Sequence, residues 1–138
     1  DGRDCWCGRT GCLDCFLSLG GLETEYHNIT QTRLDIKAIA AAADANDLVA
    51  SSVLQVLDDR IGRTTAMIIN MFDPDVIILG GRLAGLDRLY QNVPRKWPGY
   101  LLVERNETKL QKANQDVFTL AKGAACLAID PAIKSSPH

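Results

Sequence analysis

The sequence predicts one α/β domain that carries a metal-binding loop near its N-terminus. Three observations lead to this prediction: four cysteines crowd into positions 5–15, apolar residues recur at helical spacing over 48–72, and a β-branched apolar run fills 76–79. A chain of 138 residues can bury about two-thirds of its unfolded surface, which is enough for one hydrophobic core. We therefore expect residues 1-138 to form one unit, since no internal linker divides them.

The composition limits the kinds of protein that this chain can be. It is 46% hydrophobic and 23% charged, as globular domains are, and 15 basic against 17 acidic residues leave a net charge of -2. This charge implies no basic surface, so we expect no nucleic-acid partner. No apolar run reaches the roughly 20 residues of a membrane span, and the N-terminus lacks the pattern of a signal peptide. Because clustered cysteines do not staple distant segments, we expect a reducing cytoplasm.

The stretch CWCGRTGC is the strongest chemical feature of the sequence. Zn²⁺ takes about four thiolate or imidazole ligands in a tetrahedron, and short turns between cysteines gather such ligands. Gly8 and Gly11 suit these turns because glycine adopts positive φ at little steric cost. The spacing C-x-C-x4-C-x2-C offers four candidate ligands: Cys5, Cys7, Cys12 and Cys15. We expect a structural zinc knuckle at about residues 5-15 rather than a redox site, because no CxxC pair opens a helix after a strand.

Other candidate ligands have simpler interpretations. Cys15 starts an apolar run and is either a fourth ligand or a small buried hydrophobe. Cys126, within GAACLA, is expected to be a buried hydrophobe. His27 is a candidate ligand from outside the loop, but a lone histidine after Tyr26 is more often a surface residue.

The first half of the chain is expected to be helical. Residues 14–26 suit one helix or two short ones, interrupted at Gly20-Gly21. Asp35 is a suitable N-cap for the alanine-rich helix IKAIAAAA, and Asp47 for a helix that reaches about residue 72. One apolar stripe of this long helix is expected to face the core: Ala50, Val53, Leu54, Leu57, Ile61, Ile68 and Phe72. Its charged residues are expected mainly on the solvated side: Asp58, Asp59, Arg60 and Arg63.

A strand and a glycine turn follow the long helix. Asp73-Pro74 ends the helix, and Val76–Leu79 is an unalternating apolar run, typical of a strand buried on both faces in a parallel or mixed sheet. Gly80-Gly81 comes next, and glycines at the carboxyl end of such a strand let a ligand approach the backbone. A tight turn without a ligand is the simpler alternative. The spacing fits neither GxGxxG nor GxxxxGK[ST], so no Rossmann or P-loop site is implied.

The remaining segments are expected to form shorter elements. These are a helix at 86–90, an irregular segment at 97–99, a strand or helix end at 100–104, and an edge strand near 108–112. Residues 119–129 are expected to form a helix that packs closely on a neighbour, because one of its faces carries small residues: Gly123, Ala124 and Ala125. The tail from Pro131 is expected to fray.

Several segments together resemble the ROK family of sugar kinases and sugar-responsive repressors. CWCGRTGCLD is close to the family signature C-x-C-G-x-x-G-C-x-E, and other similar segments follow in the family's order: SLGGLETEY, DPDVIILGG, LDRLYQNV and KGAACLA. CWCG, DPDVIILGG and DRLYQ are most similar to the bacterial fructokinase and mannokinase branch. The resemblance spans nearly the whole chain. It implies the C-terminal portion of an actin-like (ribonuclease H-like) ATPase fold, with helices packed on a mixed sheet.

The resemblance implies an ATP-dependent hexose kinase, most of all a fructokinase, that transfers the γ-phosphoryl group of Mg-ATP to a sugar hydroxyl. The family's phosphate loops, catalytic Asp and Glu-x-Gly-His element precede the cysteines, so we expect this chain to be a partial C-terminal lobe that is inactive alone. A cytoplasmic homodimer is also implied. The alternative is a sugar-responsive repressor of the same family without kinase activity. A free-standing zinc interaction module is a third, less favoured hypothesis.

The resemblance also implies a ligand set for zinc. Cys5, Cys7 and Cys12 match three of the family's ligands, and the fourth is the histidine of the preceding element. Cys15 is its only substitute within this chain.

Further residues match the family's ligand-binding positions. Asp14 stands where an acidic residue binds sugar hydroxyls, and Gly80 and Gly81 match the turn at the adenosine end of the nucleotide. Three departures lead us to consider altered or weak activity. Asp14 replaces a longer Glu, Arg82 stands where the fructokinase branch usually has a third glycine, and Leu120 stands where that branch tends to carry Gly.

Overall fold

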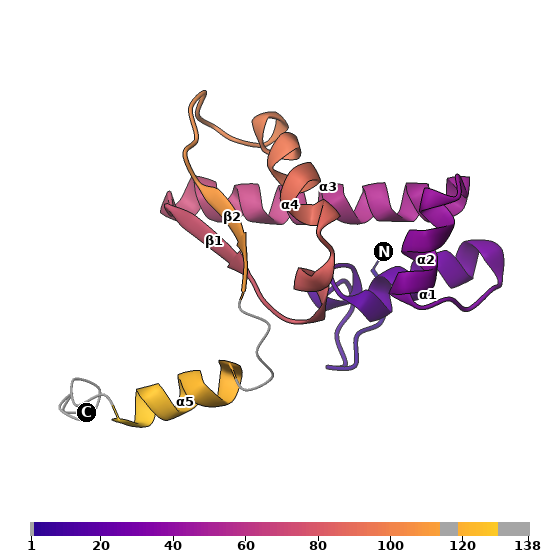
Figure 1. The fold of residues 1–138 in the computed structure, drawn as a ribbon, viewed down its shortest axis with the longest axis horizontal. Coiled ribbons are helices and arrows are strands. Elements are labelled where there is room, and N and C mark those ends of the chain that lie inside the picture. Colours follow the sequence, from indigo (N-terminus) through magenta and orange to yellow (C-terminus); the bar gives the residue numbers. More distant parts are fainter. Residues whose placement is uncertain (1, 114–118, 130–138) are drawn as a thin grey trace.

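The chain folds around one long helix, as Figure 1 shows. The computed structural model describes residues 2–113 and 119–129, with side chains at 121–126 in the second range. The elements are, in order, η1 Leu13–Cys15, α1 Leu19–Thr30, α2 Ile36–Asp44, α3 Leu48–Phe72, β1 Val76–Leu79, η2 Arg82–Gly85, α4 Arg88–Lys96, η3 Trp97–Gly99, β2 Lys109–Lys112 and α5 Thr119–Ile129. Helices α1, α2 and α4 pack on α3, and the core lies between them. Among the described helices, none is long and apolar enough to cross a membrane.

The helix starts confirm the predicted caps. The Asp35 carboxylate accepts the Ala38 N–H at 2.8 Å, and the Asp47 carboxylate accepts the Ala50 N–H at 2.8 Å. The expected break at Gly20-Gly21 is wrong, because both glycines lie inside α1. Ser18 starts that helix by accepting the Gly21 N–H at 3.1 Å, so the break falls before the glycines.

The apolar stripe of α3 is confirmed in its first half and shifted in its second. Ala50, Val53, Leu54, Leu57 and Ile61 are buried, as expected. The last turns bury a different set: Thr65, Ala66 and Ile69. Ile68 is only half-buried and Phe72 is 70% exposed, because the buried side of α3 drifts around the helix axis: two steps of four residues from Ile61 lead to 65 and 69.

One charged residue of α3 contradicts the expected solvated face. Asp58 is only 2% exposed, whereas Asp59 and Arg63 lie on the outer side. The α4 residues Arg88 and Asn92 donate to Asp58, so a partner that is distant in sequence makes its burial tolerable.

The strand Val76–Leu79 forms as predicted, but it is not buried on both faces. It pairs in parallel with β2, from Val76 opposite Lys109 to Leu79 opposite Lys112. Ile77 and Leu79 pack against the core, while Ile78 is 60% exposed. Among the described elements, none covers this second face of the sheet.

The later elements partly follow expectation. The helix expected at 86–90 runs from Arg88 to Lys96, and 100–104 is loop rather than strand or helix end. Helix α5 has the expected bounds, but its residues 121–126 are exposed and Figure 1 draws it apart from the other elements. The predicted close packing is wrong for these residues. Small side chains allow another element to approach a helix closely, but they do not ensure that one lies there. The Leu120 side chain and the tail from Pro131 lie outside the described part.

Candidate functional site

The N-terminal loop brings three thiols together. The sulfur atoms of Cys5, Cys7 and Cys12 all lie within 4.8 Å of one another, and those of Cys7 and Cys12 are 3.6 Å apart. Gly8 and Gly11 have φ of 82° and 73°, which confirms the expected glycine turns. Soft ligands on a tight loop at this spacing have the donor chemistry that a zinc ion prefers.

The protonation of these thiols is interdependent. The pKa of Cys5 is lowered, mainly because the Cys7 backbone N–H donates to its sulfur. The pKa of Cys12 is raised to about 12, because its thiol donates hydrogen bonds to the Cys7 and Cys5 sulfurs and like charges oppose its ionisation. All three thiols could therefore ionise together only if a cation, such as a divalent metal ion, neutralised the charge between them.

The other candidate ligands lie outside this group of three. The Cys15 sulfur donates to the Asp4 carbonyl oxygen at 3.6 Å, and burial raises its pKa. Cys126 is exposed on α5, so its expected burial is wrong: no described element covers that helix. His27 is half-buried on α1, and its Nδ1 is buried without a hydrogen-bond partner among the described residues.

A network that sequence inspection missed fastens the cysteine loop to the helices. Arg3 donates to the carbonyl oxygens of Cys15 at 3.2 Å and Gly21 at 3.0 Å, and pairs with Glu25 at 3.0 Å. Arg60 pairs with the same carboxylate at 2.5 Å. Burial alone would raise the pKa of Glu25, but hydrogen bonds from Arg60 and Arg3 hold it below its ordinary value.

An aromatic ring completes this network. The guanidinium groups of Arg3 and Arg60 lie 4.9 and 5.0 Å from the centre of the Phe16 ring. These residues come from segments far apart in sequence, so no local pattern signalled their contact.

Asp14 lies in η1, two residues after Cys12, and is exposed. Its carboxylate makes no hydrogen bond or ion pair with any residue of the described ranges. The η1 turn that carries it is held by backbone hydrogen bonds, including Cys15 N–H to Cys12 O at 3.0 Å. A ligand is therefore able to reach the carboxylate of Asp14.

The Gly80-Gly81 turn is open to ligands. Gly81 has φ of 72°, and a Cβ placed on either glycine would meet no atom within 4 Å. A cavity of about 330 Å³ joins the turn to the start of α1: Leu17, Ser18, Leu19, Gly20, Gly80, Arg82 and Leu83 line it. The structure thereby brings the predicted turn to the helix that follows the cysteine loop.

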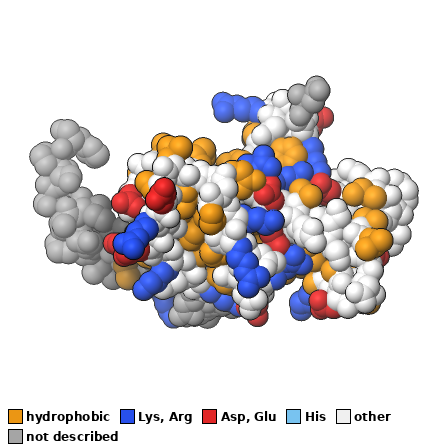
Figure 2. All heavy atoms as spheres, turned by 90° about the horizontal axis from the view of Figure 1, so that it is seen from above, with side chains coloured by type: hydrophobic (Ala, Val, Ile, Leu, Met, Phe, Trp, Pro, Cys, Tyr) orange, Lys and Arg blue, Asp and Glu red, His pale blue; other side chains and the backbone are white. Residues whose placement is uncertain are grey.

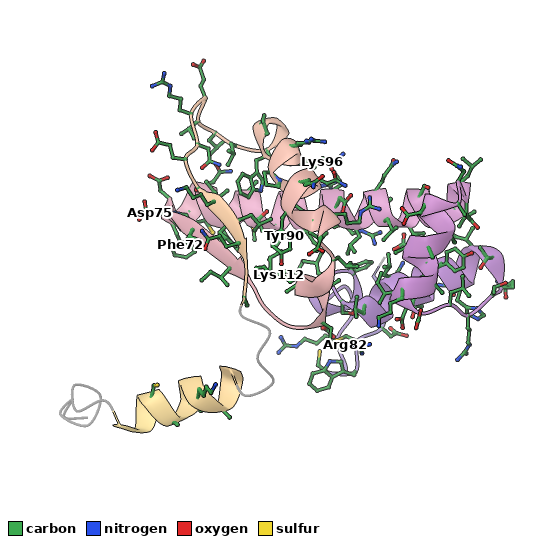
Figure 3. The ribbon with its side chains drawn as sticks, viewed as in Figure 1. Phe72, Asp75, Arg82, Tyr90, Lys96 and Lys112 are labelled. Atoms are coloured by element: carbon green, nitrogen blue, oxygen red, sulfur yellow. The ribbon has the colours of Figure 1, made fainter. Side chains whose placement is uncertain are left out.

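Arg82 lies at the edge of this cavity. Figure 3 labels Arg82 at the lower end of the segment that leads from β1 to α4, at the start of η2. Arg82 is exposed and has no ion-pair partner in the described part of the chain. Its guanidinium is therefore free to contact an anionic group.

A larger cavity lies elsewhere. It has a volume of about 730 Å³ over η1 and α3, and Phe16, Asp59, Arg63 and Lys96 are among its lining residues. It contains none of the predicted site residues. Figure 2 shows basic, acidic and apolar side chains interleaved on the face drawn there, without one extended basic patch.

Curated proteins that are similar in sequence to this chain include sugar kinases. The chain is 33% identical over 124 residues to an N-acetyl-D-glucosamine kinase of Pasteurella multocida, and 32% identical to that of Mannheimia succiniciproducens. Both alignments cover 90% of this chain and 41% of the relative. The chain thus spans about two-fifths of the length of these curated relatives.

Solved structures share the fold. A ROK hexokinase from Thermus thermophilus superposes with a TM-score of 0.76 at 24% identity, over 91% of this chain and 43% of that one. A ROK glucokinase from Streptomyces griseus, solved with glucose and AMPPNP, gives 0.75 at 24% identity, over 92% and 47%. A ROK transcriptional regulator, a homologue of the E. coli MLC protein, gives 0.67 at 27% identity, over 81% and 31%.

The family model described as "ROK family" matches residues 1–131. This match covers the cysteine loop, the long helix and the glycine turn. The chain therefore belongs to the ROK family.

Proposed function

We propose that this chain is the C-terminal lobe of an ATP-dependent hexose kinase. The observation that carries the proposal is the cavity that joins the Gly80-Gly81 turn to the start of α1, directly after the cysteine loop. An open glycine turn at a strand's carboxyl end suits a nucleotide, and an exposed carboxylate beside a metal loop suits sugar hydroxyls. The full protein transfers the γ-phosphoryl group of Mg-ATP to a sugar hydroxyl.

The cysteine loop serves as a structural zinc knuckle. Cys5, Cys7 and Cys12 supply three thiolates, and the fourth ligand is either a residue of another segment or Cys15, whose thiol neighbours that of Cys5. Bound zinc supplies fixed geometry rather than chemistry at the substrate. The loop then holds Asp14, whose carboxylate accepts hydrogen bonds from two sugar hydroxyls.

The glycine turn serves as the adenosine wall of the nucleotide site. Gly80 and Gly81 leave room for close approach of a ligand to the backbone, because neither has a neighbour within 4 Å of its Cβ position. Arg82 sits at the end of this wall without an ion-pair partner among the described residues, and it contacts the nucleotide.

Phosphoryl transfer depends mainly on positioning and charge neutralisation. A carboxylate that accepts the proton of the sugar hydroxyl is required as well. We assign none of these catalytic groups to this chain and expect the 138 residues alone to have no kinase activity. Phosphorylation of a hexose by the purified chain would contradict this assignment.

Two observations favour different hexoses as the substrate. The segments DPDVIILGG and DRLYQ favour fructose, whereas the curated relatives at 32–33% identity are N-acetyl-D-glucosamine kinases. A coupled ADP-release assay of the full-length protein with fructose, mannose, glucose and N-acetyl-D-glucosamine distinguishes them. ADP release with none of these sugars would refute the kinase proposal.

A sugar-responsive repressor is the second candidate. The 27% identity to a ROK transcriptional regulator supports it, as does the departure at Arg82. A repressor binds sugar through Asp14 and shows no sugar-dependent ADP release, so the same assay combined with a sugar-binding titration separates the two candidates. In either case we propose a cytoplasmic homodimer, which sedimentation of the full-length protein tests.

A further inference from the structure

A buried ionic cluster joins α3 to α4 and has no role in the function proposed above. The Asp58 side chain is 3% exposed, and one of its oxygens accepts hydrogen bonds from Arg88 Nη2 at 2.7 Å and Asn92 Nδ2 at 2.9 Å. The other oxygen, and Nε of Arg88, are buried without a hydrogen-bond partner in the described part of the chain. Loss of water from these charges is costly, so the cluster is poorly explained by stability alone.

The geometry of the two helices shows what the cluster controls. A Cβ on Gly62 would lie 2.7 Å from Cβ of Lys96, so α3 and α4 are in close contact one helical turn after Asp58. Apolar packing alone tolerates sliding between helices, whereas a carboxylate with two fixed donors on α4 selects one register. The cluster therefore fixes the position of α4, including its first residues, relative to α3.

The start of α4 in turn anchors the segment that contains the glycine turn. Arg88 is the first residue of α4, and residues 80–87 connect it to the end of β1. The Tyr90 hydroxyl donates to the carbonyl oxygen of Ala84 at 2.9 Å, and Ala84 is fully buried. Lys112 at the end of β2 pairs with Asp87 at 3.0 Å. Figure 3 shows Tyr90 and Lys112 close together between α4 and the strands.

We propose that Asp58 is a positioning residue for the Gly80-Gly81 turn and acts on it through Arg88 and α4. Asp58 itself touches no ligand in this scheme. It sets the place of residues 80–87, and hence of the adenosine wall and Arg82. The role in nucleotide binding rests on the kinase function proposed above, whereas the mechanical link from Asp58 to the turn does not.

The test uses Asp58→Asn in the full-length protein. This change keeps the size of the side chain and one carbonyl acceptor, but removes the charge that Arg88 faces. We expect the KM for MgATP to rise about tenfold while the KM for the sugar stays within about twofold, since the loss of one well-placed contact weakens binding by about tenfold. Amide hydrogen exchange over residues 80–87 is expected to accelerate, with no change over α1.

Asp59→Asn is the matched control. The carboxylate of Asp59, the next residue along the helix, pairs with Arg63 at 2.6 Å on the outer face of α3. The KM for MgATP and the amide hydrogen exchange of residues 80–87 should therefore keep the values of the original protein. A purely structural role for Asp58 predicts a lower melting temperature with both KM values unchanged in the folded fraction. That result, or unaltered exchange over 80–87, would overturn the proposal.

A second variant covers the case in which Asp58→Asn does not fold. Asn92→Ala removes one donor and leaves the pair between Asp58 and Arg88 intact, so a smaller change of the same sign is expected. Unchanged exchange over residues 80–87 in Asn92→Ala would then refute the positioning role. If the original protein phosphorylates no hexose, the kinase proposal fails, but the exchange comparison still decides whether Asp58 positions the turn.

Discussion

Replacing Gly21 by alanine tests how closely the cysteine loop is seated on α1. Gly21 lies in the first turn of α1, where alanine is intrinsically better than glycine by up to about 1 kcal/mol. A Cβ at this position would lie 2.4 Å from the carbonyl oxygen of Cys15 and 2.9 Å from its carbonyl carbon. Both are backbone atoms, so the loop has to move as a unit.

The steric cost exceeds the propensity gain. Forced shifts in a packed region cost about 1–3 kcal/mol. The Arg3 hydrogen bonds to the Cys15 and Gly21 carbonyl oxygens, at 3.2 and 3.0 Å, weaken as these groups separate. We expect Gly21→Ala to lower the free energy of unfolding by about 1–2 kcal/mol.

Gly20 provides a control one residue away. A Cβ on Gly20 has its nearest neighbour, Ser18 Oγ, at 4.0 Å, so Gly20→Ala should stabilise the protein by up to about 1 kcal/mol. Urea unfolding of both variants, followed by circular dichroism, measures the two effects with opposite signs. Equal stabilisation by the two substitutions would show that the close contact between η1 and α1 does not exist.

Three further outcomes follow from the site. Cys7→Ser should weaken zinc binding by more than the roughly 10–100-fold typical of changes outside the ligand set, as metal analysis after dialysis measures. Because Arg60 and Arg3 hold the pKa of Glu25 below its unfolded value of about 4.3, the stability from this carboxylate is present above that value and is lost as pH falls. Glu25→Gln should therefore lower the free energy of unfolding near neutral pH, and the difference from the original protein should shrink in acid. Arg82→Ala in the full-length protein should raise the KM for MgATP about tenfold, because a charge-assisted hydrogen bond is lost.

Each of these outcomes has a control within the chain. Cys126→Ser should keep its zinc, since Cys126 is exposed on α5 and lies outside the thiol group. Arg95→Ala removes an exposed arginine from the last turn of α4 and should leave the KM for MgATP unchanged. If the difference in the free energy of unfolding between Glu25→Gln and the original protein stayed constant down to acid pH, the lowered pKa of Glu25 would be contradicted.

Local chemistry made several elements predictable. Asp35 and Asp47 act as caps at the expected residues, because a carboxylate and the N–H three positions later are neighbours in any helix start. The thiols of Cys5, Cys7 and Cys12 converge because the glycine turns between them constrain a short loop. The parallel pairing of Val76–Leu79 also agrees with its unalternating apolar pattern.

Other features depend on partners that are distant in sequence. Asp58 looks like a surface residue of α3 until Arg88 and Asn92 are placed against it. The exposed second face at Ile78 has the same origin, since burial requires a covering layer and none is present among the described elements. Spacing alone predicts Ile68 and Phe72 in the core, but small errors in phase accumulate along the 25 residues of α3.

The helix caps, the strand and the three-thiol loop could be predicted because each follows from residues within a few positions of one another, and the family could be recognised from similar segments in the same order along the chain. Tertiary structure alone decided that Arg3 and Arg60 clamp the loop through Glu25, and that the Gly80-Gly81 turn borders the start of α1. It also decided that the buried carboxylate of Asp58 holds α4 in place. Hydrogen bonds and ion pairs act over a few ångströms, so residues far apart in the chain interact only after folding has brought them together.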